Sequence, residues 1–190
     1  MAKVKLNPIL EQISGKVGDL VFRRYGDETV IAQKPDMSGV EASPAQLAVR
    51  ARFREAALYG KMVMADPQTK ALYTEAAKAK GKPAFSLTVA DFFNAPSVDE
   101  VDLSAYRGAV GDEIIIMASD DFDVMSVEVV LSDGEGNLLE SGAAVETPPD
   151  SGRWVYAATA AVATGTTVRI AVTASDRPGS LDTAEEEKAV

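Results

Sequence analysis

The sequence contains no cysteine and no histidine among its 190 residues. Without cysteine, neither disulfide bonds nor thiolate zinc sites can form. Without histidine, the chain lacks the most frequent general base and the most frequent transition-metal ligand, which excludes histidine-based triads and hydrolysis by histidine-bound zinc. An enzyme of this composition would need a site made of carboxylates alone, and the sequence shows no such constellation. We therefore expect a protein that is not an enzyme.

Long apolar runs are also missing. No stretch approaches the roughly 18 apolar residues of a membrane-spanning helix, and residues 1–8 lack the apolar run of a secretory signal peptide. We therefore expect a protein that does not insert into a membrane. The absence of cysteine fits an exported or particle-borne protein as well as a cytosolic one, and we favour the cell surface or a particle over the cytoplasm.

Charge is distributed very unevenly along the chain. Residues 1–95 contain 14 Lys and Arg against 10 Asp and Glu, a net charge of +4, whereas residues 96–190 contain 5 against 19, a net charge of −14. A molecule with opposite fields at its two ends attracts copies of itself head to tail. The same positions mark a change in periodicity from helical to strand-like.

The first half predicts a β-hairpin followed by three helices. A β-prone run over residues 16–22 and a second over residues 29–32 flank the turn-forming pair Gly26-Asp27. The segment Ser43-Pro44-Ala45-Gln46 is typical of a capping box, with a helix to about residue 64. Asp66-Pro67 repeats the device for a second helix that ends at Gly81, and a third short helix is expected over residues 87–93.

The second half predicts an all-β immunoglobulin-like sandwich. Short runs rich in β-branched residues recur at about the 8–12-residue spacing of that fold, separated by Gly, Asp and Pro. Val127, Val129 and Leu131 alternate with Glu128, Val130 and Ser132, as in a half-buried strand. We therefore expect a basic hairpin and helical module over residues 1–95, an acidic sandwich over residues 96–178 and a flexible acidic tail over residues 179–190. The predicted strands cover 113–118, 124–131, 138–145, 153–160 and 166–174, with one more at 101–103.

Several motifs resemble those of a widespread group of uncharacterised bacterial and phage-associated proteins. The matching segments are Ser14-Gly15-Lys16-Val17-Gly18, the helix start at residues 43–46 with Arg50 and Phe53, and the Asp66-Pro67 helix with Leu72-Tyr73. In such proteins this module is sometimes followed by immunoglobulin-like segments, which Trp154-Val155-Tyr156 and residues 174–179 resemble. The resemblance implies a structural or assembly-related role and brings no known activity with it.

Two sets of residues are candidates for contacts between copies of the chain. Four basic residues are expected to meet the acidic half of a neighbouring copy: Arg23, Arg24, Arg50 and Arg54. In the N-terminal segment, apolar residues are spaced as in a strand, and the exposed edge of a sandwich is a natural acceptor for an added strand. These residues are Val4, Leu6 and Ile9.

Two further clusters are candidates for ligand binding. Carboxylates gathered at loops of the sandwich are suited to Ca²⁺, although their spacing is not that of an EF-hand and turns explain them as well. They are Asp120, Asp121, Asp123, Asp133 and Glu135. Trp154 and Tyr156 lie two residues apart on one strand face, where they form either a stacking platform for a sugar or peptide, or part of the sandwich core.

The sequence favours a non-enzymatic structural protein whose copies associate head to tail into a filament, a tube or the surface of a particle. The alternative is an immunoglobulin-like module that binds glycan or protein, with possible Ca²⁺ assistance. A third hypothesis is a nucleic-acid-binding accessory protein, but a net charge of +4 over residues 1–95 is small for that role. The expected partner is therefore another copy of the chain or another structural protein.

Overall fold

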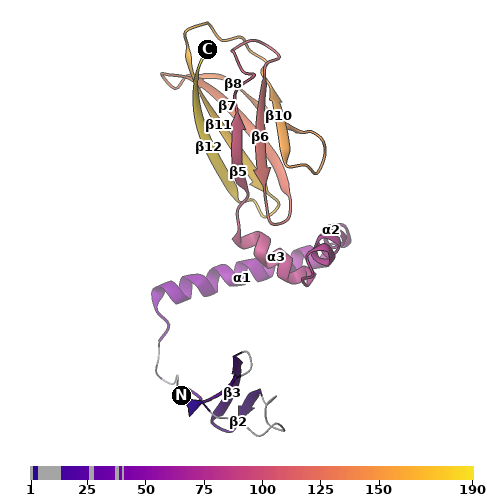
Figure 1. Ribbon diagram of the computed structural model, residues 1–190, viewed down its shortest axis with the longest axis vertical. Helices are drawn as coiled ribbons and strands as arrows, with labels where there is room; N and C mark the ends of the chain where they lie inside the picture. The colour runs from indigo at the N-terminus through magenta and orange to yellow at the C-terminus, as the bar shows by residue number, and fades with distance from the viewer. Residues whose placement is uncertain (1, 4–13, 26–27, 37–38, 40) are drawn as a thin grey trace. The chain divides into compact units, whose positions relative to one another are not determined.

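The computed structural model describes residues 2–3, 14–25, 28–36, 39 and 41–190. It divides the chain into an N-terminal unit of residues 1–47 and a C-terminal unit of residues 48–190. A small sheet comes first along the chain, then three helices, then two antiparallel sheets packed as a β-sandwich (Figure 1). This order confirms the predicted fold class. The division differs from the expected boundary at residue 95, and independent folding of residues 96–178 stays a prediction.

Within the described part of the N-terminal unit, the small sheet has four antiparallel strands in the order β1-β4-β3-β2. The prediction of one strand over residues 16–22 is wrong, because Gly18 and Asp19 form a turn within it. Gly18 has a φ of +59°, a left-handed conformation that glycine adopts without strain. The strands are β1 (Ala2–Lys3), β2 (Gly15–Val17), β3 (Leu20–Tyr25) and β4 (Glu28–Gln33).

The first two helices begin with the side-chain caps that the sequence predicts. At the start of α1 (Pro44–Ala65), the Ser43 hydroxyl accepts a hydrogen bond from the Gln46 backbone N–H at 3.3 Å, and the Gln46 side chain accepts one from the Ser43 N–H at 3.1 Å. At the start of α2 (Pro67–Ala79), the Asp66 carboxylate accepts a backbone N–H of the first turn at 2.9 Å. Each cap satisfies a donor that the helix itself leaves free.

Helix α3 (Ala84–Phe93) packs closely against α1 at Gly60. A Cβ atom at this position would lie 2.6 Å from the Thr88 hydroxyl oxygen and 2.8 Å from the Phe85 ring, so only glycine allows this approach. Among the described residues, no helix combines the length and the apolar character needed to cross a membrane. The buried apolar residues between the helices are Val63, Tyr73, Ala77 and Leu87.

The β-sandwich of the C-terminal unit consists of two four-stranded antiparallel sheets with the orders β5-β6-β10-β9 and β12-β11-β7-β8 (Figure 1). Taken in chain order, these are strands A, B, E and D on one sheet and G, F, C and C′ on the other, which is the immunoglobulin-like arrangement. The strands are β5 (Ser97–Asp102), β6 (Glu113–Ser119), β7 (Val124–Asp133), β8 (Leu138–Ala143), β9 (Val145–Glu146), β10 (Arg153–Ala157), β11 (Thr167–Asp176) and β12 (Leu181–Ala189).

The sandwich core is built from alternate residues of the central strands. Val127, Val129 and Leu131 of β7 are buried, which confirms the predicted alternation. Strand β11 contributes every second residue in the same way. The remaining buried apolar residues come from β6, β10 and the connecting loops and form one continuous core with these two strands. The β6, β10 and β11 members are Ile114, Ile116, Ala118, Trp154, Tyr156, Val168, Ile170, Val172 and Ala174.

The prediction of a flexible tail over residues 179–190 is wrong. Strand β12 pairs with β11 over nine positions, from Ala189 opposite Thr167 to Leu181 opposite Ser175. Its glutamates lie on an edge strand, where charged side chains protect the open edge from pairing with other chains. A charged edge strand therefore has the composition of a disordered tail while being fully paired on its inner side.

Candidate interaction surfaces

Helix α1 presents large apolar side chains to solvent. Phe53, Leu58 and Met62 are 55%, 60% and 72% exposed. Val49 and Phe53 lie one turn apart and continue the line of the buried residue Ala56 toward the helix N-terminus, whereas Leu58 and Met62 lie on another side of the helix. We refer to Leu58 and Met62, which lie one turn apart on one side of the helix, as the α1 apolar surface. Exposed clusters of this kind mark sites of interaction.

One face of the small sheet is also apolar and open. The strand register puts Val17, Leu20, Phe22 and Ile31 on the same face, which we call the sheet face. Val17 and Leu20 are 66% and 45% exposed, and Phe22 and Ile31 are half-buried. Among the described side chains of the N-terminal unit, only Thr29 is buried. A small sheet gains stability by packing a hydrophobic face against another element, and these side chains provide such a face.

The four arginines of the predicted assembly surface lie on two elements. Arg23 and Arg24 are neighbours on β3, so their side chains point to opposite faces of the sheet. Arg50 and Arg54 are exposed one turn apart on α1 and continue as a row into Leu58 at the same four-residue spacing. The structure therefore groups the second pair and separates the first. The other predicted interface residues lie outside the described part of the chain: Val4, Leu6 and Ile9.

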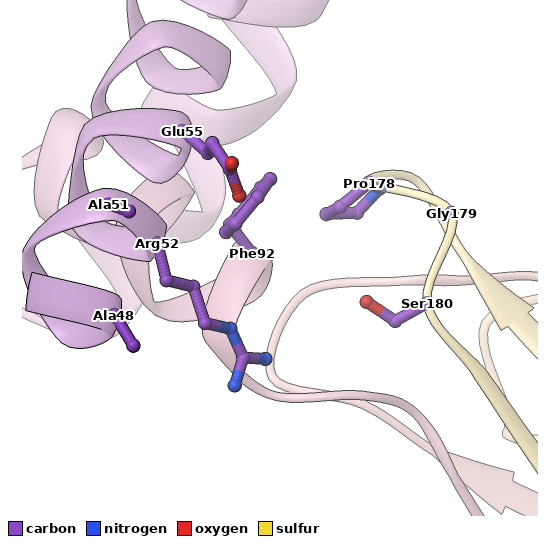
Figure 2. A pocket seen from close by; sticks show the side chains of 8 residues that line it. All are labelled: Ala48, Ala51, Arg52, Glu55, Phe92, Pro178, Gly179 and Ser180. Carbon is purple, nitrogen blue, oxygen red and sulfur yellow. The ribbon is translucent and has the colours of Figure 1, made fainter. Parts of the chain in front are cut away.

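A pocket of about 490 Å³ lies between α1, the end of α3 and the turn between β11 and β12 (Figure 2). Figure 2 shows Phe92 and Pro178 on opposite sides of it, with Glu55 near the Phe92 ring. The Arg52 guanidinium donates a hydrogen bond to the Phe93 backbone carbonyl at 3.4 Å and lies 5.2 Å from the centre of the Phe93 ring. Sequence reasoning missed this pocket because its walls are far apart along the chain.

Asp91 of α3 is a carboxylate with no exposed surface. Its Oδ2 accepts hydrogen bonds from the Tyr73 hydroxyl and, at 3.4 Å, from the Tyr59 hydroxyl, and the two hydroxyl oxygens are 2.7 Å apart. Burial raises the pKa of Asp91 to about 7; the bond from Tyr73 lowers it, and the negative charges of Asp120 and Asp176 raise it further. Burial also raises the pKa of Tyr59 to about 12 and that of Tyr73 well above its usual range.

Two carboxylates of the sandwich, Asp120 and Asp176, lie near Asp91. Asp120, in the loop between β6 and β7, accepts two backbone N–H groups of its own turn through Oδ2, and Asp176, at the end of β11, accepts two through Oδ1. In each of the three acids the second oxygen is buried and has no hydrogen-bond partner among the described residues. These atoms, which we call the orphan oxygens, are Asp91 Oδ1, Asp120 Oδ1 and Asp176 Oδ2.

The β6–β7 loop makes further contacts with the helices beside these carboxylates. The Phe122 ring stacks on Tyr73 with ring centres 3.8 Å apart and an interplanar angle of 15°. The Arg177 guanidinium lies 5.8 Å from the Phe122 ring centre and 3.5 Å from the Asp123 carboxylate. Two polar side chains of the helical region donate hydrogen bonds to Asp121: Lys80 to its carbonyl and Asn94 to its carboxylate. We call this region, in which residues 120–123, Asp176 and Arg177 of the sandwich lie beside the helices, the junction.

The predicted calcium ligands lie at the two ends of β7, where Asp120 and Asp133 accept backbone N–H groups of their turns. Asp120, Asp121 and Asp123 precede the strand, whereas Asp133 is its last residue and Glu135 follows it. A ten-residue strand separates its ends by roughly 30 Å. The Asp133 carboxylate accepts the backbone N–H of Glu135 at 2.9 Å, and hydrogen bonds to its turn lower its pKa. Within the described ranges, no group of three or more acidic side chains is arranged to hold a metal ion.

A second pocket, of about 380 Å³, lies at the end of the sandwich that carries the β6–β7 loop. Burial raises the pKa of Asp123 in its wall, against the lowering effect of Arg177, and two further acids add to the rise. The pocket is therefore electronegative. Its acidic lining residues are Asp99, Asp120, Asp123, Glu146 and Asp150.

Trp154 and Tyr156 belong to the sandwich core. They are 8% and 3% exposed and pack within the main hydrophobic cluster. The Tyr156 hydroxyl donates a hydrogen bond to the Glu140 carboxylate at 3.1 Å. The core interpretation is confirmed, and the stacking-platform interpretation is wrong, because neither ring presents a face to solvent.

Comparisons with known proteins place few limits on function. No protein-family model matches the sequence, and no curated protein is significantly similar to it. Among solved structures, the C-terminal β region has a distant match to a carbohydrate-binding module, a bromine derivative of BhCBM56. The match has 20% sequence identity and a TM-score of 0.31, and covers 44% of this chain and 86% of that one. The resemblance to bacterial and phage-associated proteins stays a prediction.

Proposed function

We propose that the protein is a non-enzymatic structural building block whose copies associate through the sheet face of one molecule and the α1 apolar surface of the next. The observation that carries this proposal is the presence of two open apolar surfaces on one chain. Two different surfaces make a head-to-tail contact, which either closes into a ring or propagates as a filament. A filament, a tube or the surface of a particle is the corresponding setting.

The size of the two surfaces supports a weak contact that repetition strengthens. Full burial of one large apolar side chain contributes about 1.5–3 kcal/mol. The two residues of the α1 apolar surface are already partly covered, so covering the remainder contributes about 2–4 kcal/mol. Association costs on the order of 4–15 kcal/mol in lost freedom of motion. A single contact of this size is therefore transient, and assembly depends on protein concentration.

Substitution of the α1 apolar surface tests the proposal. Leu58→Glu with Met62→Glu puts two charges on α1, and the matched control Leu138→Glu with Val145→Glu puts the same charges on sandwich positions that are 65% and 66% exposed. We expect wild-type protein and the control to assemble with rising concentration, and the α1 variant to stay monomeric, by analytical ultracentrifugation and electron microscopy. Wild-type protein that stays monomeric in low salt at high concentration, or equal loss in the control, would overturn the proposal.

The acidic pocket favours a second candidate function, in which the sandwich binds glycan or protein. A pocket with several carboxylates around a hollow of about 380 Å³ is suited to a ligand that donates hydrogen bonds or carries positive charge. The same ultracentrifugation separates the two candidates. A protein that stays monomeric but binds glycan or a basic peptide saturably would favour the binding module.

A further inference from the structure

We propose that a proton shared between Asp91 and Asp120 fastens the three helices to the sandwich, so that the junction is closed while the proton is bound and loosens when it is lost. The junction lies inside the C-terminal unit, and its closure does not depend on self-association. It assigns a role to the orphan oxygens, which neither the fold nor the proposed function uses.

The hydrogen bonds around Asp91 leave one oxygen free for this proton. The hydroxyls of Tyr59 and Tyr73 both lie against Oδ2 and hold the carboxyl in place. Oδ1 is buried and has no hydrogen-bond partner among the residues that the structure describes. The β6–β7 loop brings Asp120 to the same place, because Tyr73, the donor to Asp91, stacks on Phe122 two residues after Asp120. The Asp120 Oδ1 is also buried and has no hydrogen-bond partner in the described part of the chain. Two facing carboxylates are both acceptors when charged, whereas one proton turns them into a donor and an acceptor.

The other groups around the pair make the charged form costly. Asp176, from the end of β11, adds a third carboxylate whose Oδ2 is an orphan oxygen. Tyr59 from α1 and Tyr73 from α2 are neutral donors and supply no positive charge. Among the described residues, two cations lie at the junction, but the Arg177 guanidinium pairs with Asp123 and the Lys80 ammonium donates to the Asp121 carbonyl. Buried charge that lacks a partner is destabilising, so the arrangement favours a neutral Asp91.

The sign of the pH dependence follows from linkage. Asp91 has a pKa of about 7 in the closed junction, against an ordinary pKa of 3.8 for the carboxyl in water. Between these two values the closed form binds more protons than the open form, so a rise in pH favours opening by up to about tenfold per pH unit. Junction opening does not depend on pH below the pKa of the open form, and the dependence levels off above the pKa of the closed form. The junction is therefore tightest in acid and weakest above neutrality.

Hydrogen exchange of the full-length protein at several pH values tests this. Protection factors for residues 120–123 and for the turn at residues 177–180, corrected for intrinsic exchange, are compared for wild type, Asp91→Asn and the surface control Asp99→Asn. An asparagine amide replaces the donor of the protonated acid and does not titrate. We expect protection to fall by at least tenfold between pH 5.5 and 7.5 in wild type and the control, and to stay level in Asp91→Asn.

A second measurement keeps the proposal testable if Asp91→Asn fails to fold. The side-chain carboxyl carbon of Asp91 in wild-type protein is followed by ¹³C NMR across the same pH range, and we expect one titration with its midpoint near neutrality. Level protection in the wild type, an unchanged pH dependence in Asp91→Asn, or a carboxyl that titrates near the ordinary aspartate range would each overturn the proposal.

Discussion

Buried carboxylates in this protein are stabilised in two opposite ways, and the number of hydrogen bonds that each accepts decides which. Glu140 of β8 accepts hydrogen bonds through Oε2 from the Thr159 N–H at 2.7 Å, the Thr159 hydroxyl at 2.5 Å, the Ala160 N–H at 3.1 Å and the Tyr156 hydroxyl at 3.1 Å. Burial alone would raise the pKa of Glu140, but these donors outweigh it and lower the pKa. Burial raises the pKa of Asp91, the hydrogen bond from Tyr73 is too little to offset it, and the charges of Asp120 and Asp176 raise it further.

Replacing Glu140 tests whether its negative charge stabilises the folded protein. Glu140→Gln removes the charge that four donors stabilise, and hydrogen bonds to a charged group contribute about 1.5–3 kcal/mol each, so we expect a loss of at least 2 kcal/mol in the free energy of unfolding at pH 7. The folded pKa of Glu140 lies below the ordinary glutamate value of 4.5. The stability that the carboxylate supplies is therefore present above pH 4.5 and is lost as the pH falls through the folded pKa.

Urea unfolding at pH 7 and at progressively lower pH provides the measurement. The exposed Glu128→Gln on β7 is the control, and it should change the free energy of unfolding by less than about 0.5 kcal/mol. A gap between wild type and Glu140→Gln that stayed constant down to pH 3 would contradict the role assigned to the charge.

For single residues, the sequence predicted the environment correctly where a residue type usually occupies the same place in this kind of fold. The single Trp of an immunoglobulin-like sandwich is normally core, and Trp154 is buried as predicted. Asp91 was missed, because an aspartate in a short helix suggests a solvent-facing position. Its partners Tyr59 and Tyr73 come from two other helices, and no spacing along the chain connects them. The junction could only be found once the helices were placed in three dimensions.

Secondary-structure elements were predictable where local chemistry decides them and were missed where pairing decides them. The caps at Ser43 and Asp66 fix the helix starts by hydrogen bonds within four residues. Strand β12 was missed because its glutamates are acceptable only once β11 supplies a full ladder of partners. The turn at Gly18 was missed because an apolar run continues on both sides of it.

Deletion of β12 tests whether this strand is needed for the stability of the sandwich. Removing residues 181–190 leaves β11 as an open edge and uncovers part of its core-facing side. We expect loss of a cooperative thermal transition and aggregation at concentrations at which the intact chain is clear, because an unprotected strand edge pairs with other chains. The control replaces Glu185, Glu186 and Glu187 by Gln, which keeps the strand. If the truncated chain melted like the intact one, these residues would behave as the tail that the sequence suggested.

At the scale of the whole molecule, charge and apolar surface have separate roles. The net charges of +4 for residues 1–95 and −14 for residues 96–190 give the chain opposite ends, and such fields guide copies toward one another more than they hold them together. The α1 apolar surface is continuous with Arg50 and Arg54 along one row of the helix. Composition alone revealed the charge, whereas exposure of the apolar residues required the structure.

Charge reversal on α1 tests the role of the field. We expect Arg50→Glu with Arg54→Glu to weaken association, whereas Lys70→Glu with Lys78→Glu, the same change in net charge on exposed positions of α2, should have a smaller effect. Each exposed pair contributes only about 0.2–1 kcal/mol. Sedimentation at about 0.1 M and 1 M salt, where the Debye length falls from about 10 Å to about 3 Å, should show the difference between the variants disappearing at high salt. A difference that persists at 1 M salt would point to direct packing by the arginines.

The junction affects the order in which parts of the protein fold during its synthesis. Asp91 and Asp120 are made first, but Asp176 follows Asp120 by 56 positions, and β11 must be present before β7 has both of its neighbours. At about 5–20 residues per second, a ribosome takes roughly 3–11 seconds to bridge that interval. For that time the nascent helices have no completed sandwich to fasten to, and the acid pair sits without its third carboxylate. Closure of the junction is therefore a late event that waits for the last strands to emerge.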